Sequence, residues 1–137
     1  MSAPRSGEGH AAATGIVRDF LAALEMRDVD RAQAYLAPDV RIVVPGGREV
    51  RAVADIVANS SRRYRRIGKH IERIEVLDAP PATVIVYCLG TLHGAWHDDT
   101  PFDGIRFIDR FELRGGRIVL QEVWNDAAER RAALAQR

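Results

Sequence analysis

The amino-acid sequence predicts an α+β fold, in which helices pack on one face of a curved, mostly antiparallel sheet. Apolar residues recur at helical spacing between residues 14 and 64, with one short alternating segment among them. From residue 69 to residue 125 the chain instead reads as four strand-like runs separated by short turns. Helices that precede a run of strands, rather than alternating with them, are typical of α+β proteins. Three helices on such a sheet would form a cone whose mouth is expected to hold an apolar small-molecule pocket.

The composition is that of an ordinary globular domain. The 137 residues suffice for one domain, and 47% apolar with 28% charged residues is typical of soluble proteins. A net charge of +1 favours neither nucleic acid nor a membrane surface as a partner. The single cysteine, Cys88, excludes an internal disulfide and fits a cytoplasmic location. We expect a disordered lead-in over residues 1–13, which lack a signal-peptide core, and one domain over residues 14–137.

Three helices are expected in the first half of the chain. Thr14 is the expected N-cap of the first, whose apolar face comprises Ile16, Val17, Phe20, Leu21 and Leu24. Asp28 or Asp30 caps a short second helix that ends at Pro38 and turns Ala32, Tyr35 and Leu36 inward. A short strand over residues 40–44 follows, and the third helix begins near Glu49 with Val50, Val53, Ala54, Val57 and Tyr64 on its buried stripe. The arginines at its end, residues 62–66, indicate either a solvated helix terminus or an anion-binding patch.

The second half of the chain predicts four strands and a short last helix. Residues 69–77 form the first strand, and a turn over residues 78–81 leads to a long second strand over residues 83–96. Gly90 and Gly94 interrupt that second strand, and glycines inside a strand often mark bulges or bends, so we expect it to be curved. After a turn at residues 97–101 comes a hairpin over residues 104–125, and a C-terminal helix begins at Asp126.

The hairpin carries the residues that most invite a functional interpretation. A Gly115-Gly116 pair between two alternating runs predicts a two-residue turn of type I′. With that turn, one face of the first run holds Ile105, Phe107, Asp109, Phe111 and Leu113. The matching face of the second run holds Ile118, Leu120, Glu122 and Trp124. Each apolar face thus includes one acid.

Counting back from the turn sets Asp109 opposite Glu122, with Cβ atoms about 5 Å apart. Two like charges on an apolar surface are unfavourable unless one acid holds a proton, a cation is recruited or water stays close. Because carboxyls in such surroundings are typical of acid–base sites, we predict Asp109 and Glu122 as catalytic residues. The alternative is that Glu122 pairs with an arginine and Asp109 hydrogen-bonds a structural partner.

Other side chains complete the predicted site. His93 would serve as a second proton carrier near the mouth of the cone if its face points inward, and otherwise it is a solvated or structural residue. Trp124 is a candidate for contact with a flat apolar ligand, and the hydroxyls of Tyr35 and Tyr64 could point inward. The residues expected to line the pocket are Phe20, Tyr35, Val44, Tyr64, Tyr87, Phe107, Phe111, Leu120 and Trp124. No recognised ligand spacing predicts a metal, and no cofactor motif is present.

Three segments carry a resemblance to a known family: Phe20-Leu-Ala-Ala-Leu-Glu-Met-Arg-Asp-Val-Asp, Leu36-Ala-Pro-Asp-Val-Arg-Ile-Val-Val-Pro-Gly-Gly and Ile108-Asp-Arg-Phe-Glu-Leu-Arg-Gly-Gly-Arg-Ile. They resemble the nuclear transport factor 2-like (cystatin-like) superfamily, and especially its SnoaL-like and ketosteroid-isomerase-like branches. The resemblance covers nearly everything from Thr14 to Asp126. It implies a cone-shaped mixed sheet wrapped on about three N-terminal helices. It is a poor guide to activity, because the superfamily includes isomerases, dehydratases, cyclases, epoxide hydrolases and non-enzymatic modules.

The family's functional positions match this sequence in part. In the ketosteroid-isomerase comparison the general base falls at Val44, the oxyanion-hole tyrosine at Phe20 and the second oxyanion donor at Asp109. The acid–base aspartate of SnoaL-like cyclases also falls at Asp109, whereas Phe20 again replaces the tyrosine of scytalone-dehydratase-like members. Epoxide hydrolases of this fold pair two acids around an arginine, which Asp109 and Glu122 imitate, but Arg106 is predicted to face away.

Two functional hypotheses follow. The first is a cofactor-independent lyase, isomerase or cyclase that moves a proton on an apolar small molecule, cyclic molecules included. In this hypothesis Asp109 is the acid or base, and Glu122 tunes the pKa of Asp109. The second is a non-catalytic ligand-binding or dimeric assembly module, favoured by the loss of polar groups at Phe20 and Val44. A mixed outer face with Ile108, Val119 and Val123, together with the resemblance, suggests a homodimer through the sheet.

Overall fold

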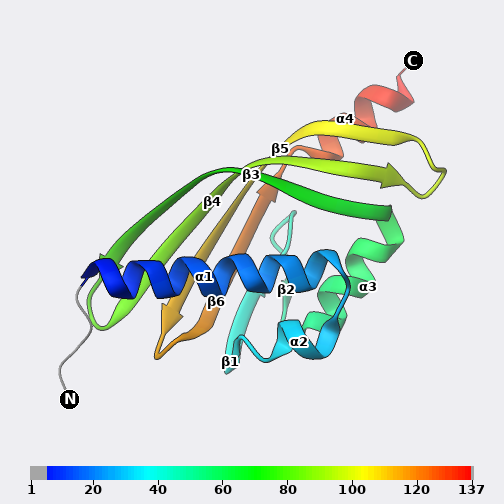
Figure 1. Ribbon diagram of the computed structural model, residues 1–137. Helices are drawn as coiled ribbons and strands as arrows, with labels where there is room; N and C mark the ends of the chain where they lie inside the picture. The colour runs from blue at the N-terminus through cyan, green and yellow to red at the C-terminus, as the bar shows by residue number, and fades with distance from the viewer. Residues whose placement is uncertain (1–5, 137) are drawn as a thin grey trace.

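The computed structural model describes residues 6–136 and shows a curved six-stranded sheet with helices on its concave side (Figure 1). The strands are β1 (Leu36–Val43), β2 (Glu49–Val50), β3 (Tyr64–Ala79), β4 (Thr83–Trp96), β5 (Pro101–Arg114) and β6 (Arg117–Asn125). Their order in the sheet is β2-β1-β6-β5-β4-β3. Neighbouring strands are antiparallel except β1 and β6, which are parallel. The predicted α+β class and the mixed, curved sheet are confirmed.

The helices are α1 (Ser6–Glu25), α2 (Val29–Gln33), α3 (Val53–Arg63) and α4 (Ala127–Ala135). Figure 1 shows α1 crossing the concave side of the sheet, with α2 and α3 beside its C-terminal end. Val17 and Phe20 on the predicted face of α1 are fully buried, and the Phe20 ring meets the Phe111 ring edge-on at 6.1 Å. Burial of such side chains supplies most of the stability of a helix in a protein. None of the helices described is long and apolar enough to cross a membrane.

Several predicted boundaries are wrong. Helix α1 begins at Ser6 rather than Thr14, so the part of the predicted lead-in from residue 6 onward is helical, and residues 1–5 lie outside the described part of the chain. Ala13 is buried in the core, and the His10 ring hydrogen-bonds Asp78 at 3.0 Å, which ties this extension to the sheet. Tertiary contact thus overrides the low helix propensity of the glycines in this segment.

The region between α2 and β3 also differs from the prediction. Asp28 caps α2 by accepting a hydrogen bond from the backbone N–H of Arg31, as one of the two predicted options. Strand β1 then begins at Leu36, so Pro38 lies in the strand rather than at a helix end. It falls where the pairing with β6 is irregular, which is where a strand tolerates proline. Strand β2 replaces the expected first turn of the third helix, and β3 begins at Tyr64 instead of Lys69.

Strand β4 has the predicted bounds, and the predicted bulge lies next to its glycines. A Cβ atom on Gly90 would lie 1.9 Å from the backbone carbonyl oxygen of His70, and one on Gly94 would lie 2.1 Å from that of Arg66. The backbones of β3 and β4 therefore approach each other more closely than any side chain would allow. The pairing of β4 with β5 shifts between Leu92 and Gly94, which accompanies the curvature of the sheet.

The β5–β6 hairpin has the predicted turn but a different register. Gly115 and Gly116 have φ values of 56° and 74°, as a type I′ turn requires. Between Glu112 and Leu113 the register shifts, because Leu113 pairs with Ile118 whereas Glu112 pairs with Leu120. One extra residue on β6 moves every later residue of that strand to the other face. Asp109 consequently pairs with Val123, and the predicted pairing of Asp109 with Glu122 is wrong.

Candidate functional site

A cavity of about 130 Å³ lies between the C-terminal half of α1, helix α3 and the sheet. Most of its wall is hydrocarbon, including Leu21, Leu24, Ile42, Val44, Ile67 and Leu92. Cavities of about 150 Å³ with apolar walls accept benzene-sized molecules. The space therefore suits a small apolar compound, or the apolar part of a larger one that extends out of the mouth.

Lys69 contributes one of the positive charges on the cavity wall, which Arg27 and Arg63 also line. In β3, Lys69 pairs with Leu92 of β4, and Leu92 pairs with Ile105 of β5. The three side chains therefore share the concave face of the sheet. Asp109 lies four residues further along β5 and has the same parity as Ile105. The long lysine side chain reaches diagonally across β4, and its Nζ lies 2.5 Å from Oδ2 of Asp109. This is a charge-assisted hydrogen bond, stronger than one between neutral groups.

The two members of this ion pair have different surroundings. The Asp109 side chain is completely buried, whereas the Lys69 side chain is 21% exposed and lines the cavity. The ammonium also lies 4.9 Å from the centre of the Phe107 ring, at cation–π range. Lys69 is thus the member of the pair that a bound molecule could contact. Asp109 contacts the ammonium from the buried side.

Asp109 is only partly satisfied by this contact. Its second oxygen, Oδ1, is buried without a hydrogen-bond partner among residues 6–136. Its β4 neighbour Cys88 is equally buried, and that burial, reinforced by the negative charge of Asp109, raises the pKa of the Cys88 thiol to about 12. A thiol with so high a pKa stays protonated near neutral pH and does not act as a nucleophile.

Gln121 of β6 is a second buried polar side chain of the cavity wall. Its Oε1 is buried without a hydrogen-bond partner within the described chain. It faces inward because of the β6 bulge, which turns Gln121, Val123 and Asn125 toward the cavity in place of the residues predicted there. A few polar groups on an otherwise apolar wall are what orients a small molecule in a binding site, and Gln121 and the Lys69–Asp109 pair are of this kind.

Comparison with known proteins assigns the family. Residues 17–121, more than half of the chain, match the model of the SnoaL-like domain. The chain belongs to the SnoaL-like family. None of the curated proteins matches it.

Solved structures share the fold of this SnoaL-like protein. Aln2 from a Streptomyces species is 15% identical with a TM-score of 0.70, and the match covers 96% of this chain and 99% of Aln2. A protein of Burkholderia pseudomallei, described as NTF2-like and of unknown function, is 22% identical with a TM-score of 0.68 over 86% of this chain and 93% of that one. A proposed polyketide cyclase from Xanthomonas campestris is 20% identical, with a TM-score of 0.66 over 84% and 90% of the two chains. At these identities the likeness shows the fold alone.

Glu122 does not belong to the SnoaL-like cavity, which corrects its predicted catalytic role. The β6 bulge turns it to the opposite face of the sheet, where its carboxylate lies 3.1 Å from Nη1 of Arg110. Arg110 also contacts Glu112 at 3.4 Å and donates a hydrogen bond to the Tyr87 hydroxyl at 3.2 Å. This is the alternative in which Glu122 pairs with an arginine. The cation that accompanies Asp109 is Lys69 instead.

The residues predicted to line the pocket fall into three groups. Val44 and Tyr64 lie on the cavity wall. Phe20, Phe107 and Phe111 are buried in the hydrophobic core, and Tyr35 packs against that core half-buried. Tyr87, Leu120 and Trp124 were expected inside but share the outer face with Arg110 and Glu122, and Trp124 is 50% exposed. The bulge explains Leu120 and Trp124, whereas Tyr87 follows from the pairing of β4 with β5.

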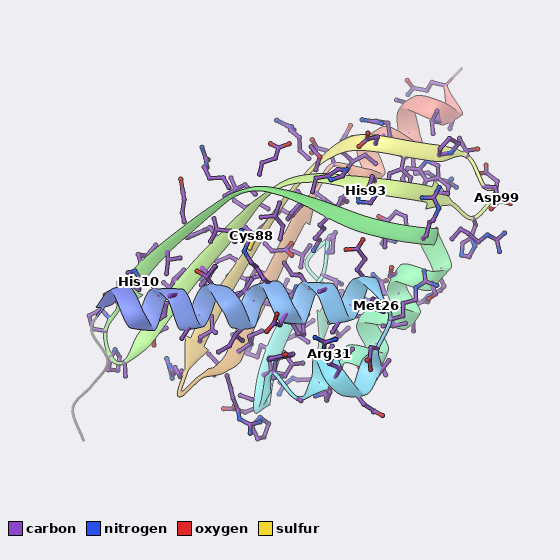
Figure 2. All side chains as sticks on the ribbon, viewed as in Figure 1. His10, Met26, Arg31, Cys88, His93 and Asp99 are labelled. Carbon is purple, nitrogen blue, oxygen red and sulfur yellow. The ribbon has the colours of Figure 1, made fainter. Side chains whose placement is uncertain are left out.

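His93 lies on the outer face of the sheet and does not line the cavity, because it alternates with Leu92, whose partner Lys69 is on the concave face (Figure 2). It pairs with Gly68 of β3, and its ring stacks on the His70 ring at a centroid distance of 4.1 Å. A Cβ atom on Gly68 would lie 2.7 Å from His93 Nε2 and 2.3 Å from Oε1 of Glu25. The missing side chain therefore makes room for an imidazole and a carboxylate above the same residue. Gly68 and Glu25 both line the mouth of the cavity.

Sequence reasoning missed Lys69 as a site residue. The signal that could have found it is its rarity, because Lys69 is the only lysine in a chain whose basic residues number 20. Around the cavity and elsewhere in residues 6–136, no group of three or more His, Cys, Asp and Glu side chains could hold a metal ion.

Proposed function

We propose that this SnoaL-like protein is a lyase, isomerase or cyclase that moves a proton on a small apolar molecule bearing a carbonyl group. The observation that carries the proposal is the Lys69–Asp109 ion pair, with Nζ on the wall of an apolar cavity and the carboxylate completely buried behind it. The likeness to a proposed polyketide cyclase supports a carbonyl-bearing substrate, because polyketides carry ketone groups.

Lys69 would act on the oxygen of the substrate. When a proton leaves the carbon next to a carbonyl, negative charge develops on the carbonyl oxygen, and a fixed cation in an apolar site stabilises that charge. A donor of this kind typically contributes about 3 kcal/mol to lowering the barrier, a factor of about 100 in rate. Asp109 would keep the ammonium aimed into the cavity, and the exchange of a proton between the two would let the pair give or take one.

The cost of this arrangement supports a functional role. A buried ion pair can often be replaced by apolar side chains with no loss of stability, or with a gain of about 1 to 4 kcal/mol. The unpaired Oδ1 of Asp109 adds a penalty of about 1 to 3 kcal/mol for a buried acceptor without a partner. A purely structural contact at this place would therefore be a poor way to stabilise the core.

Exchange of carbon-bound hydrogen for deuterium tests the proposal. Small cyclic ketones are incubated in D₂O with the protein, and loss of the α-proton signal is followed by ¹H NMR. We expect the wild type and Glu122→Gln to accelerate the exchange equally, and Lys69→Met to lose about 100-fold of that acceleration. Glu122→Gln is the matched control, because it removes a carboxylate that shares strands with the site but lies on the other face. Equal exchange in the wild type and Lys69→Met would refute the role of the lysine.

Non-catalytic ligand binding is the second candidate function. The observation that favours it is Val44 on the cavity wall, which offers no group that can take a proton where the resemblance to ketosteroid isomerase places the general base. Ketones that raise the melting temperature without any exchange of their α-protons would favour this candidate over the enzyme.

A further inference from the structure

We propose that Lys69 is a covalent site for carbonyl compounds and condenses with aldehydes or ketones to a protonated Schiff base. The inference rests on the proposed function in one respect, since both require that a carbonyl group reaches Nζ through the cavity. It goes further because it assigns a bond between substrate and protein, and so names aldehydes and ketones as the ligand class.

The position of Lys69 meets the first requirement of such a site. Its side chain lines the cavity, is 21% exposed and ends beside the Phe107 ring, so a small apolar carbonyl compound can approach Nζ while most of its surface contacts hydrocarbon. Lysine amines in apolar pockets are established nucleophiles toward carbonyl groups. Lys69 is also the only lysine in the sequence, so every lysine-derived product must come from this residue.

Asp109 supplies the proton transfers that the condensation needs. The ammonium first gives a proton to the carboxylate, whose Oδ2 lies 2.5 Å away and whose Oδ1 is free of other hydrogen bonds among the described residues. The neutral amine then forms the N–C bond as the C=O π bond breaks, and a second proton moves from nitrogen to oxygen. The product of this stage is a neutral carbinolamine beside a protonated Asp109.

Loss of water completes the reaction. Asp109 returns its proton to the carbinolamine hydroxyl, the C–O bond breaks, and one water molecule leaves. The nitrogen keeps its last proton and becomes an iminium cation. In total, one ammonium and one carbonyl give one iminium and one water, with no oxidant or reductant. The charge next to Asp109 is +1 before and after, so the buried carboxylate has a counterion in both the free and the condensed protein.

The apolar wall favours the same product. The wall that Lys69 shares with Ile42, Val44 and Leu92 is mostly hydrocarbon, and a bound apolar compound that displaces water from it opposes the hydrolysis of a reactive intermediate. An iminium is also a stronger electron acceptor than a ketone. The Schiff base would therefore promote the same proton transfer next to the former carbonyl carbon that the proposed function describes.

Reductive trapping tests the inference on the wild-type protein. The chain is incubated with benzaldehyde and cyanoborohydride at neutral pH, and the sites of benzylation are mapped by peptide mass spectrometry. The internal reference is the α-amino group of the chain. The ordinary pKa of an α-amino group is about 8, against about 10.4 for a lysine, which makes it the faster amine in the absence of a built site. We expect the opposite order, with Lys69 benzylated at least tenfold faster than the α-amino group.

Matched variants separate the possible causes. Lys69→Arg keeps a cation beside Asp109 but cannot condense, and should retain only the α-amino product. Glu122→Gln, which alters the other face of the sheet, should label like the wild type. Label on the α-amino group with Lys69 unmodified would overturn the inference. Ketone-stimulated deuterium exchange without trapping at Lys69 would overturn it and leave the proposed function standing. Trapping without exchange would support it and remove the proposed function.

Discussion

The Lys69–Asp109 pair should show strong and asymmetric energetic coupling when it is broken. Lys69→Met leaves a completely buried carboxylate without its cation, which typically costs about 3 to 5 kcal/mol of unfolding free energy. Asp109→Leu leaves an ammonium that is 21% exposed and can turn into the cavity, so we expect a smaller loss of about 1 to 2 kcal/mol. The double variant Lys69→Met/Asp109→Leu replaces the pair by hydrocarbon and should be within about 1 kcal/mol of the wild type.

The resulting coupling energy is about 3 to 7 kcal/mol, at or above the upper end for residues in direct contact. Equilibrium unfolding in urea at pH 7 measures it, with the denaturant slope required to stay constant across the four proteins. For a domain of this size, Lys69→Met should lower the melting temperature by about 10 °C. Additive single losses, with a double variant as unstable as their sum, would refute the reasoning. The double variant also serves as a control in the deuterium-exchange assay. If it is folded but does not accelerate the exchange, the loss of exchange is due to the missing ion pair and not to unfolding.

Four further predictions concern other parts of the chain. Because burial raises the pKa of the Cys88 thiol from 9.0 to about 12, its contribution to stability is complete below pH 9 and is lost as the pH rises toward 12. Urea titrations at pH 8 and pH 11 measure that loss, and a thiol reagent at pH 8 should react only as fast as the protein unfolds. Gly90→Ala puts a Cβ atom 1.9 Å from a backbone oxygen and should cost at least about 2 kcal/mol by thermal denaturation. Gly15→Ala, whose Cβ meets open space in α1, should instead stabilise by about 1 kcal/mol. Trp124→Asp removes a half-exposed aromatic from the outer sheet face, so light scattering should show a shift from homodimer to monomer if copies pair through that face.

Much of the fold could be predicted because it depends on local patterns. The helical spacing of apolar residues in α1, the continuous apolar run of β4 and the Gly115-Gly116 turn each specify their element without knowledge of the rest of the chain. The boundaries that were missed depend on tertiary contact. Helix α1 extends back to Ser6 although two glycines weaken the local preference for a helix there.

The site was harder to predict because the one extra residue in β6 decides which side chains of that strand face the cavity. The run Ile118-Val119-Leu120 is apolar at three successive positions, so its alternation does not reveal which residue is extra. Period-2 reasoning then places Glu122 inside and Gln121 outside, the reverse of what the bulge produces. Lys69 was missed for a different reason. A lysine in a strand usually indicates a solvent-facing position, and its partner Asp109 comes from β5, two strands away across β4.

The asymmetry of the pair decides which residue can carry the chemistry. The resemblance predicts Asp109 as the counterpart of the acid–base aspartate of SnoaL-like cyclases, yet its carboxylate is fully buried, and Lys69 rather than Asp109 lines the cavity. If Asp109 took a proton from the substrate directly, the lysine would have to move aside, and Lys69→Met would leave the exchange of α-protons intact or faster. If Lys69 acts on the carbonyl, Lys69→Met loses about 100-fold of the acceleration of the exchange, whereas Asp109→Asn weakens it less, by loosening the ammonium. The two mechanisms therefore predict opposite rankings of the two variants in the rate of α-proton exchange. The exposed cation and the buried anion favour the order in which loss of the lysine is worse.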